Sequence, residues 1–349
     1  MEKEANFAVQ WHLNDTCNLN CRHCYGNEIH GELSFNDLTK IISDISSTIN
    51  IWNSFTPLSK SINYTGGEPL LYKDLFKLID YSNKEGFSSA ILTNGTLVDK
   101  EKARIISNLE VNYVQISVDD IYEHHDSLRG LKDAFKMAIQ GIENLVEEGI
   151  FVNVSCTLSK LNVGRIEEII SLMATVGVSS IRFPRLIPIG RGRQLNQNIL
   201  SSAETKSAFT YLVQLSDKYS SKIEVMIDDP LFALLNSSQK CESTCNTESN
   251  IFCEGACSIG FTGICIMPDG TLYPCRKMPI PLGNVMKTPF RDIWINSEVL
   301  NNIRNINNLK GHCGNCSLSY KCKGCRAMAY AVSGDYLGND IQCWKDWGL

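Results

Sequence analysis

The alternation of strand-like and helix-like segments is the feature that most limits how this chain folds. Six apolar or β-branched runs in the first 184 residues are each followed by a segment with helical spacing of apolar residues. The expected strands are 7–13, 61–65, 89–93, 111–118, 151–158 and 180–184, and the expected helices are 34–49, 72–85, 100–109, 131–148, 164–176 and 202–219. Such alternation builds a parallel sheet with right-handed crossovers. Since a closed barrel of this kind needs eight units, we expect an α/β fold with a partial (β/α)6, TIM-like barrel.

Polar motifs follow the carboxyl ends of four expected strands. They are a group of three cysteines, Gly66-Gly67-Glu68-Pro69, Asn94-Gly95 and Asp119-Asp120. In parallel α/β folds these ends lie on one rim, where the active site is built. The order of the motifs therefore predicts a single site on that rim.

The chain has 15 cysteines among 349 residues, and their distribution is uneven. Three lie in the first 24 residues, Cys156 stands alone, and eleven lie between Cys241 and Cys343. Because composition changes near Asp228, we expect a barrel over 1–228 and a small, cysteine-rich domain over 229–349.

Charge and targeting signals limit the cellular compartment and the kinds of partner that we expect. The charged start Met1-Glu2-Lys3-Glu4 lacks the apolar run of a signal peptide, and no stretch of 18 apolar residues occurs. The net charge of -5 gives no electrostatic footprint for nucleic acid or an anionic membrane. We therefore expect a cytoplasmic protein with no nucleic-acid or membrane partner. In a reducing compartment, clustered cysteines indicate metal binding rather than disulfides.

The cysteine triplet, Cys17-x3-Cys21-x2-Cys24, follows the first expected strand. A cubic iron–sulfur cluster normally takes four thiolates, so three close thiolates leave one iron open to another ligand. The alternative is a zinc site with His12 or His23 as the fourth ligand. The triplet lacks the two close cysteine pairs that zinc sites usually show.

The triplet, followed by Tyr25, and Gly66-Gly67-Glu68-Pro69 after the second strand together resemble radical S-adenosylmethionine (SAM) enzymes. The C-terminal part resembles the SPASM extension, which carries auxiliary iron–sulfur clusters. The resemblance implies that SAM chelates the open iron of a [4Fe–4S] cluster and is cleaved to a 5'-deoxyadenosyl radical. The SAM-contacting residues that it implies are Tyr25, Gly66, Gly67, Glu68, Asn94, Ser117, Asp119 and Arg129.

Individual roles follow from the same resemblance. Gly66 and Gly67 would let the backbone approach the ligand, Glu68 would accept a hydrogen bond from the SAM ammonium, and Tyr25 would pack beside the adenine. Ser117 and Asp119 are candidates for ribose or substrate contacts, and Arg129 for the SAM carboxylate, although a salt bridge to Asp126 or Glu123 is the alternative. The family usually has glycine where this chain has Asp120.

The late cysteines fit the extension by analogy. Cys313, Cys316, Cys322 and Cys343 would bind one auxiliary cluster, expected to be [4Fe–4S]. Cys257, Cys275 and Cys325 would bind a second, with Cys253 as the fourth ligand and Cys265 as its rival. The family often places three residues, not two, before the cysteine that Cys325 represents. The alternative is a four-cysteine zinc site made by Cys313-x2-Cys316 and Cys322-x2-Cys325.

No catalytic side chain is assigned; Asp119 and Cys156 are weak candidates, and Cys156, Cys241 or Cys245 could return a hydrogen atom to a substrate radical. The resemblance implies hydrogen abstraction from a peptide or protein in ribosomal peptide maturation. It also implies a one-electron reductant such as flavodoxin or ferredoxin. With a strand starting at residue 7, we expect no N-terminal leader-binding domain, so a separate leader-binding protein is one option. Alternatives are sulfatase-maturase-like or small-molecule oxidation, for example of a sugar or a tetrapyrrole precursor, and a non-enzymatic electron carrier or zinc-stabilised interaction protein.

Overall fold

A single sheet of ten strands organises the protein. The structure is a computed structural model that describes residues 5–26, 31–236 and 257–346. The strand order is β10-β9-β8-β1-β2-β3-β4-β5-β6-β7. The strands are β1 (Ala5–His12), β2 (Leu58–Thr65), β3 (Ser88–Thr93), β4 (Tyr113–Ser117), β5 (Val152–Ser155), β6 (Ser180–Arg182), β7 (Glu224–Met226), β8 (Gly263–Ile266), β9 (Thr271–Tyr273) and β10 (Gly283–Asn284).

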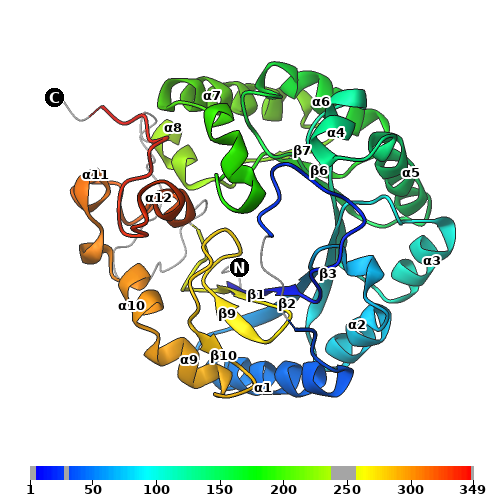
Figure 1. Cartoon of the computed structure of the whole chain (residues 1–349), viewed down its shortest axis with the longest axis vertical. Coiled ribbons are helices and arrows are strands. Elements are labelled where there is room, and N and C mark those ends of the chain that lie inside the picture. Colours follow the sequence, from blue (N-terminus) through cyan, green and yellow to red (C-terminus); the bar gives the residue numbers. More distant parts are fainter. Residues whose placement is uncertain (1–4, 27–30, 237–256, 347–349) are drawn as a thin grey trace.

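Each strand from β1 to β6 pairs in parallel with the next, and the seven strands β1 to β7 form the barrel part of the sheet. Helices cover its outer face, as Figure 1 shows for the ring from α1 to α7. They are α1 (Phe35–Asn53), α2 (Leu75–Lys84), α3 (Lys100–Asn108), α4 (Tyr122–Arg129), α5 (Ala134–Glu147), α6 (Ile166–Thr175), α7 (Ser202–Tyr219) and α8 (Ala233–Asn236). Because β7 and β10 lie at the two edges of the sheet and do not pair with each other, the barrel is open, which confirms the expected partial α/β barrel.

The structure differs from the expected elements in two places. A short seventh parallel strand, β7, lies beyond the six expected strands and pairs with β6. The expected helix over 131–148 is preceded by α4, which ends at Gly130 in the left-handed conformation (φ 71°), and α5 begins only at Ala134. Glycine adopts this conformation without strain and commonly ends helices. At α1, Ser34 caps the helix as expected, because its hydroxyl accepts the Asp37 N–H.

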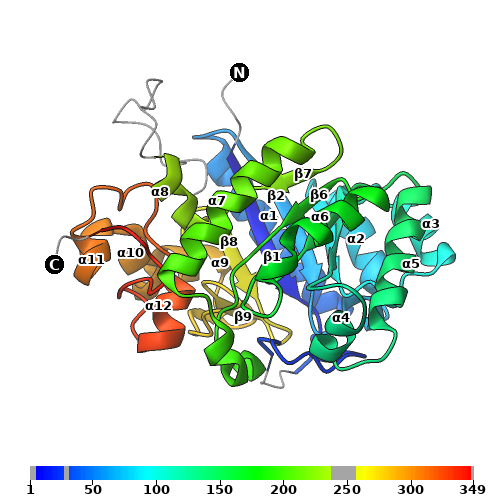
Figure 2. The same ribbon diagram turned by 90° about the horizontal axis from the view of Figure 1, so that it is seen from above.

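The C-terminal part continues the same sheet. β8 pairs in parallel with β1 on the side opposite to β2, and β9 and β10 follow in antiparallel pairing. The remaining helices are α9 (Phe290–Asn296), α10 (Glu298–Arg304), α11 (Gly311–Gly314) and α12 (Arg326–Ser333). Figure 2 shows α10, α11 and α12 gathered at one end of the molecule and α3 and α5 at the other. A division into two domains near residue 228 remains a proposal. Among the described residues, no helix combines the length and the apolar character that crossing a bilayer would require.

An aromatic cluster packs the C-terminal part against the barrel. Phe7 of β1 lies with its ring centroid 5.9 Å from Phe290 and 5.0 Å from Trp294, both of α9. Trp52 of α1 completes the group at 6.1 Å from Phe290. The Phe290 N–H also donates to an Asp44 carboxylate oxygen of α1 at 2.8 Å. Burial of these rings stabilises the contact between α1, β1 and α9.

We predict that Phe290→Ala lowers the free energy of unfolding by about 3–5 kcal/mol, since Phe290 is completely buried and the change leaves a cavity. Anaerobic chemical denaturation of the reconstituted protein measures the effect. Phe55→Ala is the matched control, because Phe55 is 83% exposed and should change stability very little. Equal midpoints for the two variants would contradict the role of this cluster.

Candidate active site and cluster-binding groups

The loop after β1 and the loop after β2 are joined along their backbones. The Gly67 N–H donates to the Asn14 carbonyl at 2.7 Å, and the Glu68 N–H donates to the Thr16 carbonyl at 2.8 Å. The Asn14 amide donates in turn to the Glu68 carbonyl at 3.1 Å. These bonds fix the segment that leads into the cysteine triplet relative to the second loop.

The two glycines are needed for this close approach. A Cβ atom at Gly66 would lie 2.4 Å from the Asn14 Oδ1, and one at Gly67 would lie 2.3 Å from the Thr16 carbonyl oxygen. Both glycines also line the cavity described below. The lack of side chains therefore serves the packing of two loops as well as the approach to a ligand.

Glu68 does not line the cavity described below. Its carboxylate is buried and accepts hydrogen bonds from the Thr93 hydroxyl (2.6 Å), the Asn94 N–H (2.9 Å) and the Leu70 N–H (3.1 Å). Burial raises the pKa of this carboxyl, and the three donors oppose that rise. A SAM ammonium would have to compete with these donors for the side chain. The geometry instead favours a role for Glu68 in holding the ends of β2 and β3 together.

Each sulfur of the triplet accepts at least one N–H, and the Cys17 Sγ also accepts from the Asn94 Nδ2 at 4.0 Å. The Cys17 Sγ accepts from the Leu19 backbone at 3.4 Å, and the Cys24 Sγ accepts from the Gly26 backbone at 3.4 Å. The Cys21 Sγ accepts from the Arg129 Nη1 at 3.6 Å. Burial raises the pKa of the Cys21 thiol, and Arg129 opposes this rise. Donors placed at the sulfurs in this way stabilise thiolates, which are the ligand form that iron requires.

Asp119 forms the centre of a buried charge network beside the triplet. Its Oδ2 lies 2.5 Å from the Arg129 Nη2 and 3.2 Å from the His23 Nε2. Burial by itself would raise the pKa of the Asp119 carboxyl, but Arg129 and His23 hold it well below its usual range. Arg129 thus pairs with Asp119 and Cys21, not with Asp126 or Glu123. Backbone bonds from Asn20 and Arg22 to the end of α4 fix the triplet to the same region.

Asp120, where the resembled family has glycine, does not disturb the turn. Within the described residues, positive φ angles of residues other than glycine occur at Glu110, Tyr122, Asp133 and Lys323, and so not at Asp120. The Asp120 carboxylate pairs with Arg165 and accepts the Ile121 N–H at 2.9 Å. An acidic side chain is therefore accommodated here without backbone strain.

One cavity of about 830 Å³ is lined by residues of three of the four predicted rim motifs. It is lined by all three triplet cysteines and by most of the residues expected to contact SAM, namely Tyr25, Gly66, Gly67, Asn94, Ser117 and Arg129. Glu68 and Asp119 lie behind this wall. The cavity is also lined by Cys275, Arg276 and Lys277, which come from the C-terminal part. The barrel and the C-terminal part therefore line the same cavity.

The contact between the two parts runs directly beside the triplet. The Lys277 Nζ lies 5.0 Å from the centre of the Tyr25 ring. A Cβ atom at Gly26 would lie 3.0 Å from the Arg276 Nη2 and 3.6 Å from the Cys24 Sγ. Sequence reasoning missed Arg276 and Lys277, because no local pattern shows that residues more than 250 positions apart line one cavity.

Three late cysteines, here called the inner group (Cys257, Cys275 and Cys325), pack against one small hydrophobic cluster. Burial raises the pKa of the Cys257 thiol to about 12, and the nearby Cys275 and Cys325 add to the rise. Lys323 and Gly324 both have left-handed backbones, with φ of 56° and 62°. This tight turn separates Cys325 from Cys322 despite the short spacing.

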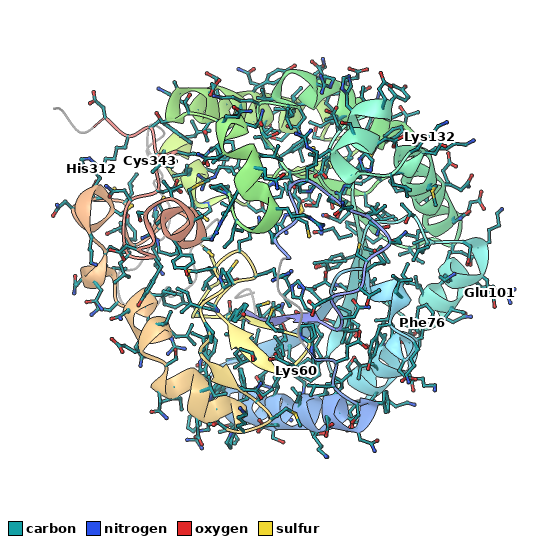
Figure 3. All side chains as sticks on the ribbon, viewed as in Figure 1. Lys60, Phe76, Glu101, Lys132, His312 and Cys343 are labelled. Carbon is teal, nitrogen blue, oxygen red and sulfur yellow. The ribbon has the colours of Figure 1, made fainter. Side chains whose placement is uncertain are left out.

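The outer group consists of Cys313, Cys316, Cys322 and Cys343. Burial raises the pKa of the Cys343 thiol, and the neighbouring Cys313 and Cys316 contribute to it. Figure 3 shows Cys343 near His312 of α11, at the edge of the molecule. In the described ranges, no three His, Cys, Asp or Glu side chains are placed to hold a single metal ion.

Two other cysteines are placed less favourably for the roles expected of them, which were cluster binding for Cys265 and hydrogen-atom donation for Cys156. Cys265 lies buried in β8 with Met267 and Tyr273, as in an apolar core. Cys156 is buried, its thiol donates to the Asp119 carbonyl at 3.3 Å, and it does not line the cavity. Cys253, Cys241 and Cys245 lie outside the described residues.

Comparison with protein families decides the relationship. Residues 11–173 match the model of the "Radical SAM superfamily", and residues 257–326 match an "Iron-sulfur cluster-binding domain", SPASM. An "AdoMet-dependent heme synthase" of Methanosarcina barkeri is 30% identical over 96% of this chain and 95% of that protein. The chain belongs to the radical SAM superfamily. This radical SAM protein is an enzyme and carries a SPASM domain.

Other similar proteins have different names. An "Fe-coproporphyrin III synthase" of M. barkeri is 30% identical over 98% of this radical SAM enzyme and 88% of that protein. A "Mycofactocin maturase MftC" of Mycolicibacterium smegmatis is 27% identical over 99% and 84%. Among solved structures, Streptococcus suis SuiB bound to S-adenosylmethionine has a TM-score of 0.75 at 17% identity, covering 98% of this chain and 78% of SuiB. At this low identity, the similarity to SuiB shows that the two proteins share a fold.

The radical SAM and SPASM domains imply a SAM-binding [4Fe–4S] cluster and auxiliary iron–sulfur clusters as cofactors. The donor set fits these groups. Three thiols open onto one cavity, each with an N–H donor at its sulfur, and seven further described cysteines form the inner and outer groups.

We predict that Gly67→Ala weakens SAM binding at least tenfold, because the new methyl group would strike the Thr16 backbone and displace the loop that leads to the triplet. Equilibrium dialysis of the reconstituted enzyme with SAM measures this. The control is Gly164→Ala, since a Cβ at Gly164 has nothing within 4 Å. Unchanged SAM affinity in Gly67→Ala would show that the loop contact is dispensable.

Proposed function

We propose that this enzyme cleaves SAM at the triplet and abstracts a hydrogen atom from a substrate held in the same cavity. The observation that carries this proposal is the shared cavity, which is lined by the triplet, by Gly66 and Gly67, and by Cys275 of the inner group. A substrate in that space would contact both the radical source and the SPASM part.

Specific side chains have distinct parts in this proposal. Cys17, Cys21 and Cys24 hold the [4Fe–4S] cluster, and Tyr25, Asn94 and Ser117 contact SAM from the cavity wall. Asp119 and Glu68 act from behind the wall, where they fix Arg129 and the end of β3. When bound, SAM and its cluster supply the 5'-deoxyadenosyl radical, and two auxiliary clusters in the extension accept an electron.

The charge of the cavity favours a substrate with carboxylates. Five cationic side chains line the cavity in the described residues, against one acidic side chain, Asp15. Two of the five are neutralised, Arg129 by Asp119 and Arg182 by Asp228. The other three are Arg191, Arg276 and Lys277. Guanidinium groups bind carboxylates with strong, directional hydrogen bonds.

We infer that the substrate is a carboxylate-bearing tetrapyrrole. Coproporphyrins carry four propionate groups, which suit a cationic wall. The inference is supported by the two relatives at 30% identity, whose names are heme synthase and Fe-coproporphyrin III synthase. The reaction would be an oxidation that starts with hydrogen abstraction from a side chain of the ring.

A peptide or protein substrate is the second candidate. It is supported by the similarity to the mycofactocin maturase over nearly the whole chain. In that case the modification would be a thioether or carbon cross-link, an oxidation or an epimerisation. An acidic side chain of the peptide would then meet the cationic wall.

The need to reduce the iron–sulfur clusters indicates which electron donor and which compartment the enzyme requires. Clusters that must be reduced before SAM is cleaved need a one-electron donor, and we propose flavodoxin or ferredoxin for this role. Such a donor and 15 cysteines kept reduced are typical of the cytoplasm, where we propose that the enzyme acts.

We predict that Fe-coproporphyrin III increases the yield of 5'-deoxyadenosine from the reduced, anaerobically reconstituted enzyme and loses mass in the same reaction. Liquid chromatography with mass spectrometry measures both products. If deoxyadenosine forms but the porphyrin neither stimulates it nor changes mass, the tetrapyrrole assignment is wrong.

The peptide candidate is tested with short open reading frames beside the gene, each co-expressed with the enzyme. A loss of two hydrogens identifies a cross-link or an oxidation. An unchanged mass with deuterium taken up from the solvent identifies an epimerisation.

A second prediction concerns the triplet. The triple variant Cys17→Ala, Cys21→Ala and Cys24→Ala should form no 5'-deoxyadenosine, yet it should keep the iron of the inner and outer groups. Iron analysis and electron paramagnetic resonance (EPR) spectroscopy measure what remains. Loss of all iron with the fold intact would refute the division of cysteines into separate clusters.

A further inference from the structure

Two cationic side chains reach sulfur atoms of the outer group. The Arg326 Nη2 donates to the Cys313 Sγ at 3.5 Å, and the Lys345 Nζ donates to the Cys316 Sγ at 3.3 Å. Lys345 also donates to the Ser317 hydroxyl at 3.1 Å. Two of the four thiols therefore accept a hydrogen bond from a positively charged group.

Arg326 is placed for this contact by its surroundings. It is 3% exposed, it opens α12, and it follows Cys325 of the inner group directly. Its Nη1 is fixed by the carbonyls of Tyr336 (3.0 Å) and Gly338 (2.7 Å). A Cβ atom at Gly324 would lie 2.9 Å from the Arg326 Nη2 and 3.4 Å from the Cys313 Sγ. A side chain at Gly324 would thus crowd the contact between Arg326 and Cys313.

The inner group is surrounded differently. In the described parts of the chain, its sulfurs accept no side-chain N–H; the Cys275 Sγ accepts the backbone N–H of Lys277 at 3.4 Å. Arg185 lies near Cys325, but Asp229 and Asp340 each lie 2.8 Å from its guanidinium and offset its charge. The positive charges of Lys277 and Arg276 both oppose the rise in the pKa of the Cys275 thiol, but neither side chain donates a hydrogen bond to its sulfur in the described residues.

We propose that Arg326 and Lys345 are positioning residues that hold the reduction potential of the outer cluster above that of the inner cluster. Reduction adds one negative charge, which hydrogen bonds and positive charges at the ligand sulfurs stabilise. With the potentials in this order, a cluster held by Cys313, Cys316, Cys322 and Cys343 would accept one electron from a cluster held by Cys257, Cys275 and Cys325, so that the inner cluster would be oxidised as the outer one is reduced and no bond would break. This inference rests on the proposed assignment of the two cysteine groups.

The test uses the triple triplet variant, so that only auxiliary clusters contribute to the EPR signal. In that background, redox titrations compare Arg326→Gln and Lys345→Gln with the charge-keeping changes Arg326→Lys and Lys345→Arg. Lys310→Gln is the matched control, because Lys310 pairs with Asp335 at 2.7 Å on the same part of the chain. Iron is counted in every sample.

We expect both glutamine variants to lower the potential of the more easily reduced cluster, the lysine and arginine variants to restore most of it, and Lys310→Gln to leave it unchanged. If Arg326→Gln loses iron because the buried carbonyls lose their donor, Lys345→Gln decides the question. An unchanged potential in Lys345→Gln with full iron content would overturn the proposal.

Cys316→Ala links the signal to its ligands. Cys316→Ala should remove or alter the same EPR signal that Lys345→Gln shifts. If it changes the EPR signal of the other auxiliary cluster instead, the proposal is overturned. Formation of 5'-deoxyadenosine by the enzyme with its triplet intact remains a separate test of the proposed function.

Discussion

The position of β1 between β2 and β8 is the constraint on which the rest of the structure depends. β1 pairs in parallel with β2 along its whole length and with β8 through residues 8–11. The loop at its carboxyl end carries the triplet. Because one strand is hydrogen-bonded to the barrel on one side and to the C-terminal part on the other, that loop lies where both can reach it. The backbone bonds to Gly67 and Glu68 then fix its first residues.

Several buried charged side chains lie beside the loop that carries the triplet. Arg129 satisfies both Asp119 and Cys21, and His23 approaches the same carboxylate. Burial and Arg129 lower the pKa of His125 to about 4, so that its neutral ring accepts the Asp119 N–H. A buried carboxylate is tolerated only when it is paired and hydrogen-bonded in this way. The network ties the end of β4, α4 and the triplet into one unit.

Much of the fold could be predicted from the sequence because it rests on local patterns. Helical spacing placed α7 over Ser202–Tyr219, and the Ser34 cap marked the start of α1. Short motifs also marked the triplet and the cysteine groups. Pairings between distant segments carry no local signal, and this is why β7, the partnership of β8 with β1, and the approach of Arg276 and Lys277 to Tyr25 were not foreseen. The contact between Glu68 and SAM was expected from the family resemblance. The three protein donors to its carboxylate come partly from β3 and the loop after it, so they cannot be read from the segment around Glu68.

The central claim is that the triplet and the SPASM cysteines hold iron around one cavity. Anomalous diffraction at the iron and zinc absorption edges, from anaerobic crystals of the reconstituted enzyme with SAM, tests it most directly. The account predicts iron at the triplet with SAM beside Gly66 and Gly67, iron between Cys257, Cys275 and Cys325 at the cavity edge, and iron within the outer group. Zinc at the late cysteines, or SAM bound away from the triplet, would contradict it.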